Sequence, residues 1–335
     1  MKKLEENKTL CPFRSIQHNY DLFYIQENNQ TQVIEFLLLG FQVSRALGKL
    51  LFCLFLVVHC LTICGNLLII ILVSTSKVLH TPMYFFISQL SIADILVTTD
   101  IVPNLLHILL YNGATITFTD CMTQFYFLCT SEVSECFLLT VMAYDRYVAI
   151  CNPLRYSSIM TNGYCAMLTA ICWLSGFSII LVYMISITQL SFCGSNIIDY
   201  IFCDIVPLLK LACSDTFIIH LEIYILSIPL IFIPTTIIVV SYTYIVSAIL
   251  RILSSTGRQK AFSTCSSHLI VVSIFYGTMF SVYVAPTKGQ TLTMSKILSL
   301  LYTVFTPLVN PIIYSLRNKD IRNSLKETFY KYLVW

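Results

Sequence analysis

The sequence predicts an all-α membrane protein, a seven-transmembrane helix bundle with a short amphipathic C-terminal helix. Of its 335 residues, 57% are hydrophobic and 11% are charged, whereas a soluble domain carries roughly 25% charged residues. The charges gather in short clusters between long apolar runs, as they do in a polytopic membrane protein. The net charge of +3 is small, and its distribution argues against nucleic acid as a partner.

A transmembrane helix needs about 20 apolar residues to cross the bilayer core. Leu50 to Val73 is such a run and contains no Asp, Glu, Lys or Arg. Six more candidate spans follow, at roughly 82–110, 121–145, 164–187, 217–250, 261–285 and 296–316. The run from Val33 to Phe41 is too short to span the bilayer and includes Glu35, so we place it in the outer tail.

The distribution of Lys and Arg predicts the orientation, because these residues concentrate on the cytoplasmic side. With the N-terminus outside, the short outer loops carry only Lys210, Lys288 and Lys296, although Arg45 and Lys49 before the first span count against this orientation. We therefore expect a multi-pass plasma-membrane protein with an extracellular tail (1–48), a seven-span domain (49–317) and a cytoplasmic tail (318–335). The inner loops and C-terminal tail then hold Lys77, Arg155, Arg251, Arg258, Lys260, Arg317, Lys319, Arg322, Lys326 and Lys331.

The two tails carry smaller signals that agree with this orientation. Asn7 and Asn29 begin Asn-x-Thr tripeptides, which are glycosylation acceptors on the luminal side. Beyond Asn318 the chain is basic, and its apolar residues are spaced as on an amphipathic helix that lies on the inner leaflet. These residues are Ile321, Leu325, Phe329 and Leu333.

Four of the 14 cysteines lie on the predicted outer side: Cys121, Cys193, Cys203 and Cys213. The compartment there is oxidising, so these cysteines can pair. Four cysteines allow three connectivities, and the residues alone leave all three open. A bridge from Cys121 to any of the other three would hold the second outer loop over the mouth of the bundle.

A series of motifs along the chain resembles one family. The motifs are Val33–Phe41, Gly65-Asn66, Pro82–Phe86, Leu90–Asp94, Met142–Cys151, Ser241-Tyr242, Lys260–His268 and Pro307–Tyr314. With these motifs in this order, the chain resembles the odorant (olfactory) receptors of class II, the tetrapod-type group within the rhodopsin-like G-protein-coupled receptors, over about residues 29 to 320.

This resemblance implies a receptor for small, mostly apolar volatile ligands that activates a stimulatory heterotrimeric G protein of the olfactory type and raises cyclic AMP. It also implies one disulfide from Cys121 to Cys203 and another from Cys193 to Cys213. The expected partners are the ligand, the G protein and the lipid bilayer. No enzyme activity is expected, and no cofactor apart from an allosteric sodium ion. An odorant-type receptor for a metabolite outside the nose fits the same residues.

The resemblance also implies a G-protein switch at the inner ends of the spans. A guanidinium near the membrane is costly unless it is paired, so Asp145 can hold Arg146 at rest until activation releases it to contact the G protein. Pro311 removes a backbone donor and bends span 7, which predicts a hinge that moves Tyr314. The remaining switch residues are Tyr147, Tyr242 and Asn310. The plainer alternatives are an Arg that only sets topology and a static kink.

Asp94 and Glu135 are carboxylates deep in spans 2 and 3. Buried like charges cannot both stay ionised without a cation or a proton. The resemblance implies a sodium site near Asn310 that acts as an allosteric brake. The alternative is that both carboxyls are protonated and only form hydrogen bonds.

Faces of spans 3, 6 and 7 are predicted to line the ligand pocket. An apolar, aromatic cavity with few polar groups suits a small volatile molecule, although each of these residues can equally serve in plain packing between helices. The predicted lining is Leu128, Cys129, Glu132 and Val133 on span 3, Tyr276, Met279, Phe280 and Tyr283 on span 6, and Leu300 and Thr303 on span 7.

Two acids depart from the family pattern. Glu132 stands where the family commonly has a small residue, and Asp100 stands where it commonly has Ser or Thr. We hypothesise that one of these two acids favours an amine or another strong hydrogen-bond donor as the ligand.

Two other function classes are disfavoured. A transporter would show inverted repeats or paired broken helices with a charged lining, and the sequence has neither. A hydrolase built on Cys265, Ser266 or Ser267 with His268 lacks an evident acid partner, so we expect His268 to be a packing or switch residue.

Overall fold

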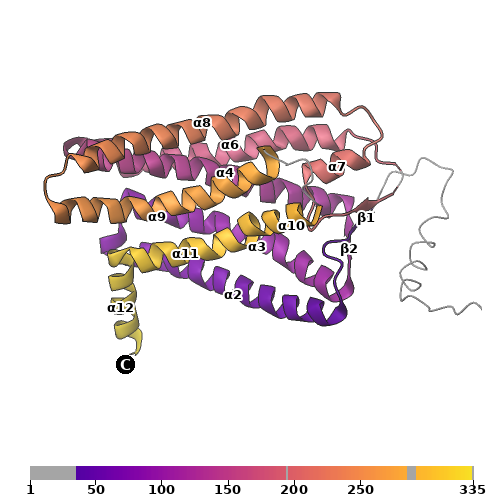
Figure 1. Ribbon diagram of the computed structural model, residues 1–335, viewed down its shortest axis with the longest axis horizontal. Coiled ribbons are helices and arrows are strands. Elements are labelled where there is room, and N and C mark those ends of the chain that lie inside the picture. Colours follow the sequence, from indigo (N-terminus) through magenta and orange to yellow (C-terminus); the bar gives the residue numbers. More distant parts are fainter. Residues whose placement is uncertain (1–34, 194, 285–291, 334–335) are drawn as a thin grey trace, which may run out of the picture.

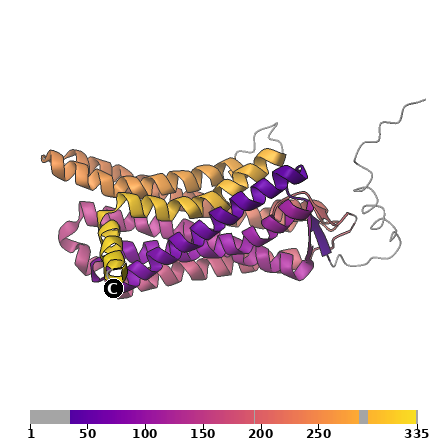
Figure 2. The ribbon, with the colours of Figure 1, turned by 90° about the horizontal axis from the view of Figure 1, so that it is seen from below.

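The structure, a computed structural model, describes residues 35–193, 195–284 and 292–333. Within these residues, seven helices are long and apolar enough to cross a membrane, and they lie side by side in one bundle (Figure 1, Figure 2). The predicted seven-span fold is therefore confirmed. The spans are α2 (Arg45–Thr75), α3 (Pro82–Tyr111), α4 (Phe118–Cys151), α6 (Asn162–Thr188), α8 (Phe217–Leu250), α9 (Ser255–Met279) continued by the π-helix η3 (Phe280–Val284), and α10 (Leu292–Leu300) joined through the π-helix η4 (Leu301–Phe305) to α11 (Thr306–Arg317).

Local capping signals set where several of these helices begin. Side chains of Ser44, Thr117, Thr161 and Ser254 accept backbone N–H bonds at the starts of α2, α4, α6 and α9, which satisfies donors that the first turn leaves free. These capping residues lie a few positions before the apolar runs, so the helices that they begin start earlier than the sequence predicted.

The spans differ in how deeply they are enclosed. In α4, 72% of the apolar window is buried, against 11% in α8, so α4 lies at the centre and α8 at the periphery. Large apolar side chains such as Leu50 and Phe232 remain exposed along α2 and α8, as expected of surfaces that face lipid. Helices α4 and α6 approach closely at Gly176, where an added Cβ would lie 2.6 Å from Ser134 Oγ.

A small sheet lies at one end of the bundle (Figure 1). Strand β1 (Glu35–Leu38) runs antiparallel to β2 (Ala114–Thr117) and parallel to β3 (Ile197–Ile198). The sequence placed β1 in the outer tail without assigning it a strand. Phe36 and Leu38 are fully buried, so this short apolar run serves to cover the end of the bundle.

Short helices complete the two ends. Helix α7 (Ile205–Leu211) lies at the sheet end, whereas η1 (Lys77–Leu79), η2 (Pro153–Arg155) and α5 (Tyr156–Ile159) form the turns at the other end. There α12 (Lys319–Leu333) turns away from the bundle axis (Figure 1, Figure 2). Ile321 is buried and Leu325 packs against the core, which fits the amphipathic helix predicted for this segment.

Candidate functional site

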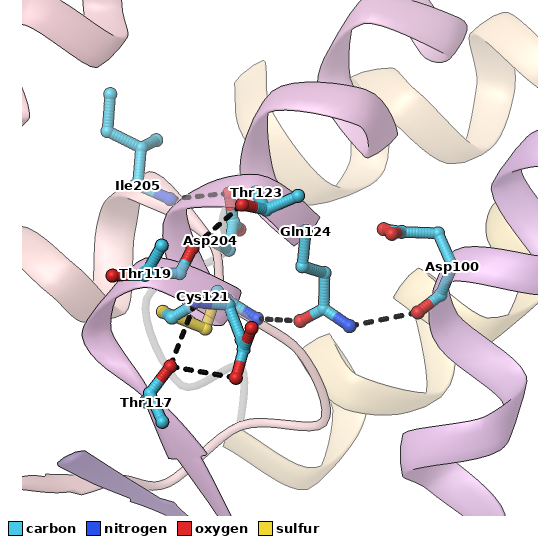
Figure 3. Close-up of a disulfide and its surroundings, with 10 residues drawn as sticks. Asp100, Thr117, Thr119, Cys121, Thr123, Gln124, Asp204 and Ile205 are labelled. Atoms are coloured by element: carbon cyan, nitrogen blue, oxygen red, sulfur yellow. Dashed lines mark hydrogen bonds between the residues drawn. A yellow bond between two sulfur atoms is a disulfide. The ribbon is translucent and has the colours of Figure 1, made fainter.

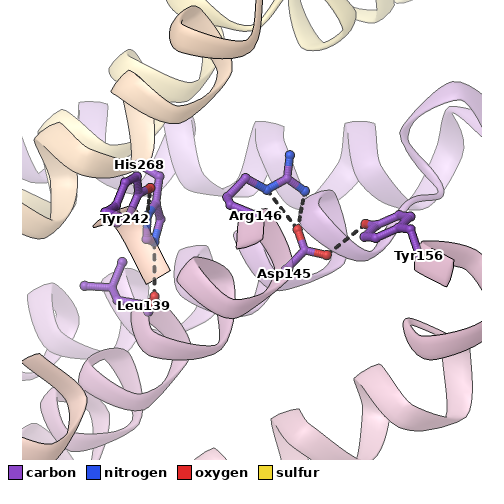
Figure 4. A network of polar contacts seen from close by, with 6 residues as sticks. All are labelled: Leu139, Asp145, Arg146, Tyr156, Tyr242 and His268. Carbon is purple, nitrogen blue, oxygen red and sulfur yellow. Dashed lines mark hydrogen bonds and ion pairs between the residues drawn. The ribbon is translucent and has the colours of Figure 1, made fainter. Parts of the chain in front are cut away.

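At the end of the bundle that carries α12, Arg146 is held by its neighbour in sequence. Its Nη2 and Nε both donate to Asp145 Oδ2, the Nε at 2.9 Å, while Tyr156 donates to Asp145 Oδ1 at 2.8 Å (Figure 4). The Arg146 and Asp145 side chains are 11% and 1% exposed. Burial, and then the Asp145 carboxylate, raises the pKa of the Tyr156 phenol, which keeps it a donor. Both acceptor oxygens of Asp145 are therefore in use.

Arg146 also faces a cavity of about 890 Å³. The cavity lies among α3, α4, α9, α11 and the start of α12, at the end opposite the sheet. It brings two predicted switch residues, Arg146 and Tyr314, to one surface. Its other lining residues include Thr81, Tyr84, Tyr156, Thr256, Gln259, Asn318 and Asp320. A recess of this size can receive the end of a partner helix.

His268 ties three spans together above this cavity. Its Nε2 contacts Leu139 O at 3.1 Å and its Nδ1 contacts the Tyr242 hydroxyl at 2.7 Å (Figure 4). A carbonyl only accepts, so Nε2 carries the proton and Nδ1 accepts from Tyr242. Both ring nitrogens thus join α9 to α4 and α8, which fits the packing or switch role predicted for His268.

The remaining switch residues lie on facing helices. Tyr147 is half-buried, and its ring meets Tyr244 of α8 edge to face at a centroid distance of 5.9 Å. Pro311 lies inside α11 and packs against α2, because a Cβ added at Gly65 would lie 3.2 Å from its ring. Tyr314 is 1% exposed, and its hydroxyl has no hydrogen-bond partner among the described residues.

The two carboxylates of the predicted sodium site lie in the centre of the bundle. Asn310 Nδ2 lies 3.0 and 3.1 Å from the two oxygens of Asp94. Glu135 is 2% exposed, and its Oε1 has no hydrogen-bond partner among the described residues. Two buried carboxylates, one with an unpartnered oxygen, fit a monovalent cation.

The predicted pocket residues divide between two parts of the core. Leu128, Val133 and Leu300 belong to the apolar cluster nearer the sheet, with Cys129 packed against it. Glu132 and Thr303 are also buried. Tyr276 and Met279 pack against the other cluster, and Tyr276 donates to Cys136 O at 3.1 Å. Phe280 is 49% exposed, and the Tyr283 side chain lies outside the described residues. The structure thus brings together the predicted lining from spans 3 and 7 but not that from span 6.

A covalently held loop covers the sheet end of the bundle. Disulfides join Cys121 to Cys203 and Cys193 to Cys213, with Cα–Cα distances of 5.5 and 5.8 Å, the pairing that the resemblance implied. Gln124 reinforces the first, because its Oε1 accepts from Cys203 N at 3.0 Å while its Nε2 donates to Asp100 O at 3.0 Å (Figure 3).

Two further contacts pin this loop, and sequence reasoning missed both. Lys296, which the sequence assigned to an outer loop, is buried in α10 and donates to Gly40 O at 2.7 Å and to Asp199 Oδ1 at 2.5 Å. The Tyr200 hydroxyl lies 2.5 Å from Ser299 Oγ, and burial raises the pKa of its phenol. Nothing in the sequence around a Lys at the end of a span predicts that it will be buried and bound to a distant loop.

Comparisons with known proteins agree on one family. A family model described as olfactory receptor matches residues 52–332. Human olfactory receptor 11L1 is 47% identical over 303 residues, which is 90% of this chain and 94% of that protein. Human olfactory receptor 11H6 is 47% identical over 88% of this chain and 89% of its own length, and mouse olfactory receptor 5AP2 is 43% identical over 92% and 98%.

Proposed function

This chain belongs to the olfactory receptor family, and on that premise we propose that it binds a small, mostly apolar volatile ligand within the bundle and activates a stimulatory, olfactory-type G protein that raises cyclic AMP. It is a multi-pass plasma-membrane receptor. The similar proteins are olfactory receptors. Both ring nitrogens of His268 already form hydrogen bonds within the bundle, so the structure does not favour a hydrolase that uses His268 as its base.

The observation that carries the coupling proposal is the cavity beside the Arg146–Asp145 pair. The cavity offers about 890 Å³ at the end of the bundle that holds α12. In the resting receptor Asp145 keeps the guanidinium occupied. When the pair opens, Arg146 becomes available to carbonyl groups at the end of an inserted G-protein helix. Tyr314 lines the same cavity and lies three residues after Pro311 in α11, so this part of α11 would supply the moving part.

We propose that the sheet end is extracellular and the α12 end cytoplasmic. The disulfides support this orientation, because they form in oxidising compartments and both lie at the sheet end. The tail before residue 49 then lies outside, with its acceptors Asn7 and Asn29, which fall outside the described residues, and the segment after 317 lies inside.

We further propose that Asp94 and Glu135 hold a sodium ion in the resting receptor. The ion would supply positive charge to two buried carboxylates, while Asn310 orients Asp94 through its amide. Because Asn310 immediately precedes Pro311, loss of the ion would alter the Asn310–Asp94 contact next to the proposed hinge.

The coupling proposal is tested in cells that express the chain with the olfactory G protein, screened against a broad odorant panel. We expect a ligand-dependent rise in cyclic AMP that Arg146→Ala abolishes at equal surface expression. A response that survives Arg146→Ala would contradict the role of the pair, and no response from any panel member at confirmed surface expression would contradict this coupling.

A further inference from the structure

Three acidic side chains lie in the half of the bundle nearer the sheet, on the side that the disulfide-bonded loop covers. Glu132 lies on α4, Asp100 on α3, and Asp204 in the loop beside the Cys121–Cys203 disulfide. Asp100 and Asp204 both lie close enough to Glu132 to interact with it through their charges. Figure 3 shows Asp100 and Asp204 on either side of Gln124.

Two of these acids have oxygens that nothing in the described protein satisfies. Glu132 is 7% exposed, and its Oε1 is buried without a hydrogen-bond partner among the described residues. Asp100 Oδ2 is also buried without a hydrogen-bond partner among the described residues. A buried polar atom without a partner lowers the stability of the fold, and a charged one lowers it more. Retaining two such atoms in one region indicates that a ligand completes them.

The described chain does not supply the missing cation. The sequence from Pro82 to Asp145, which includes spans 2 and 3, contains no Lys or Arg. Lys296 is the buried cation at this end, and it already donates to Asp199 and to Gly40 O. Lys210 is exposed on α7. Among the residues that the structure describes, no Lys or Arg forms an ion pair with Glu132 or Asp100, which leaves these acids open to a cation carried by a ligand.

We propose that the ligands of this receptor are organic amines, bound as ammonium ions with Glu132 as their main partner and Asp100 and Asp204 as supporting charges. This inference rests on the proposed odorant-binding function and narrows its ligand class. The amine accounts for the unpartnered oxygens, and the hydrocarbon body lies against the neighbouring apolar cluster, which includes Leu128 and Leu300.

The opposing possibility is that Glu132 is protonated and donates to a neutral oxygen of the ligand. Matched probes separate the two, because an alcohol with the same carbon skeleton keeps the shape and the hydrogen bond but lacks the charge. Suitable pairs are hexylamine with hexan-1-ol, cyclohexylamine with cyclohexanol, and 2-phenylethylamine with 2-phenylethanol. Primary amines are protonated at pH 7, as the Lys side chain is.

The experiment measures the melting temperature of the purified full-length receptor against the concentration of each probe. This readout needs no G protein, so it separates a failure of the amine inference from a failure of coupling. A charge-assisted hydrogen bond predicts half-maximal stabilisation by at least one amine at roughly 10- to 100-fold lower concentration than by its alcohol. Glu132→Gln should abolish this preference and Asp100→Asn should reduce it.

Glu222→Gln is the matched control. Glu222 lies on α8, where its Oε1 accepts from Ser186 at 2.9 Å and its Oε2, like Glu132 Oε1, is buried without a hydrogen-bond partner among the described residues. The same substitution there tests whether any buried carboxylate produces the amine preference, and it should leave that preference intact. The inference is overturned if no amine stabilises the wild-type receptor, if alcohols match their amines, or if the preference survives Glu132→Gln.

Discussion

Replacing Asp145 with Asn should make the receptor active without a ligand. The substitution preserves the shape of the side chain but removes the charge that holds Arg146. Hydrogen bonds to charged groups contribute about 1.5–3 kcal/mol, against about 0.5–1.5 kcal/mol for neutral ones. Because Arg146 and Asp145 are both buried, solvent screens this difference little, and we take the loss as about 1–2 kcal/mol.

In the proposed mechanism the pair is open in the active state, so that loss applies to the resting state alone. A change of about 1–2 kcal/mol shifts a two-state ratio by roughly 5- to 30-fold. If about 1% of receptors are active at rest, Asp145→Asn raises this to between about 5% and 25%. Tyr156→Phe removes only the single bond to Asp145 Oδ1, so its effect should have the same sign and be smaller.

The assay is cyclic AMP without ligand in cells matched for surface receptor. The expected order of basal activity is Asp145→Asn, then Tyr156→Phe, then wild type. Adding Arg146→Ala to Asp145→Asn should return basal activity to background, because in the proposed mechanism the released guanidinium contacts the G protein. Basal cyclic AMP equal to wild type in Asp145→Asn, with its ligand response retained, would refute the reasoning.

Three further predictions follow from the packing and the buried charges. Replacing Cys121 and Cys203 by Ser opens a loop that spans 82 residues and should cost about 4–5 kcal/mol; flow cytometry should show a sharp loss of surface receptor, and normal surface levels would count against it. Asp94→Asn should remove the dependence of the melting temperature on sodium when sodium chloride is exchanged for choline chloride, and a wild-type receptor that melts equally in both salts would argue against the site. Gly176→Leu should lower the melting temperature through overpacking of about 1–3 kcal/mol, since an added Cβ lies 2.6 Å from a hydroxyl of α4, whereas Gly163→Leu, with no atom within 4 Å, should leave it unchanged.

The seven spans were predictable because each is a local pattern, an apolar run of sufficient length. Span 5 was predicted at 217–250, and α8 is Phe217–Leu250. The strand β1 was missed because its partners, β2 and β3, lie far along the chain. A four-residue strand leaves too little periodicity to reveal such pairing.

The candidate sites show the same limit. Asp145 and Arg146 are adjacent in sequence, so their pairing was predictable, whereas the third member, Tyr156, comes from the following short helix. The sequence predicts Lys296 as an ordinary cation of an outer loop. Only the fold shows that it lies between Gly40 and Asp199. In span 6, helical spacing predicted a shared stripe, but Tyr276 and Met279 pack against a different cluster from Leu128 and Leu300.

The central claim is that a ligand in the bundle releases Arg146 to a G protein, and guanine-nucleotide exchange tests it most directly. The measurement uses the purified receptor in lipid nanodiscs, the olfactory-type stimulatory heterotrimer and the strongest agonist from the cyclic AMP screen. We predict that the agonist accelerates exchange with the wild-type receptor but not with Arg146→Ala, although a thermal shift shows that both bind it. Agonist binding to the wild type without any acceleration, or equal acceleration by Arg146→Ala, would contradict the account.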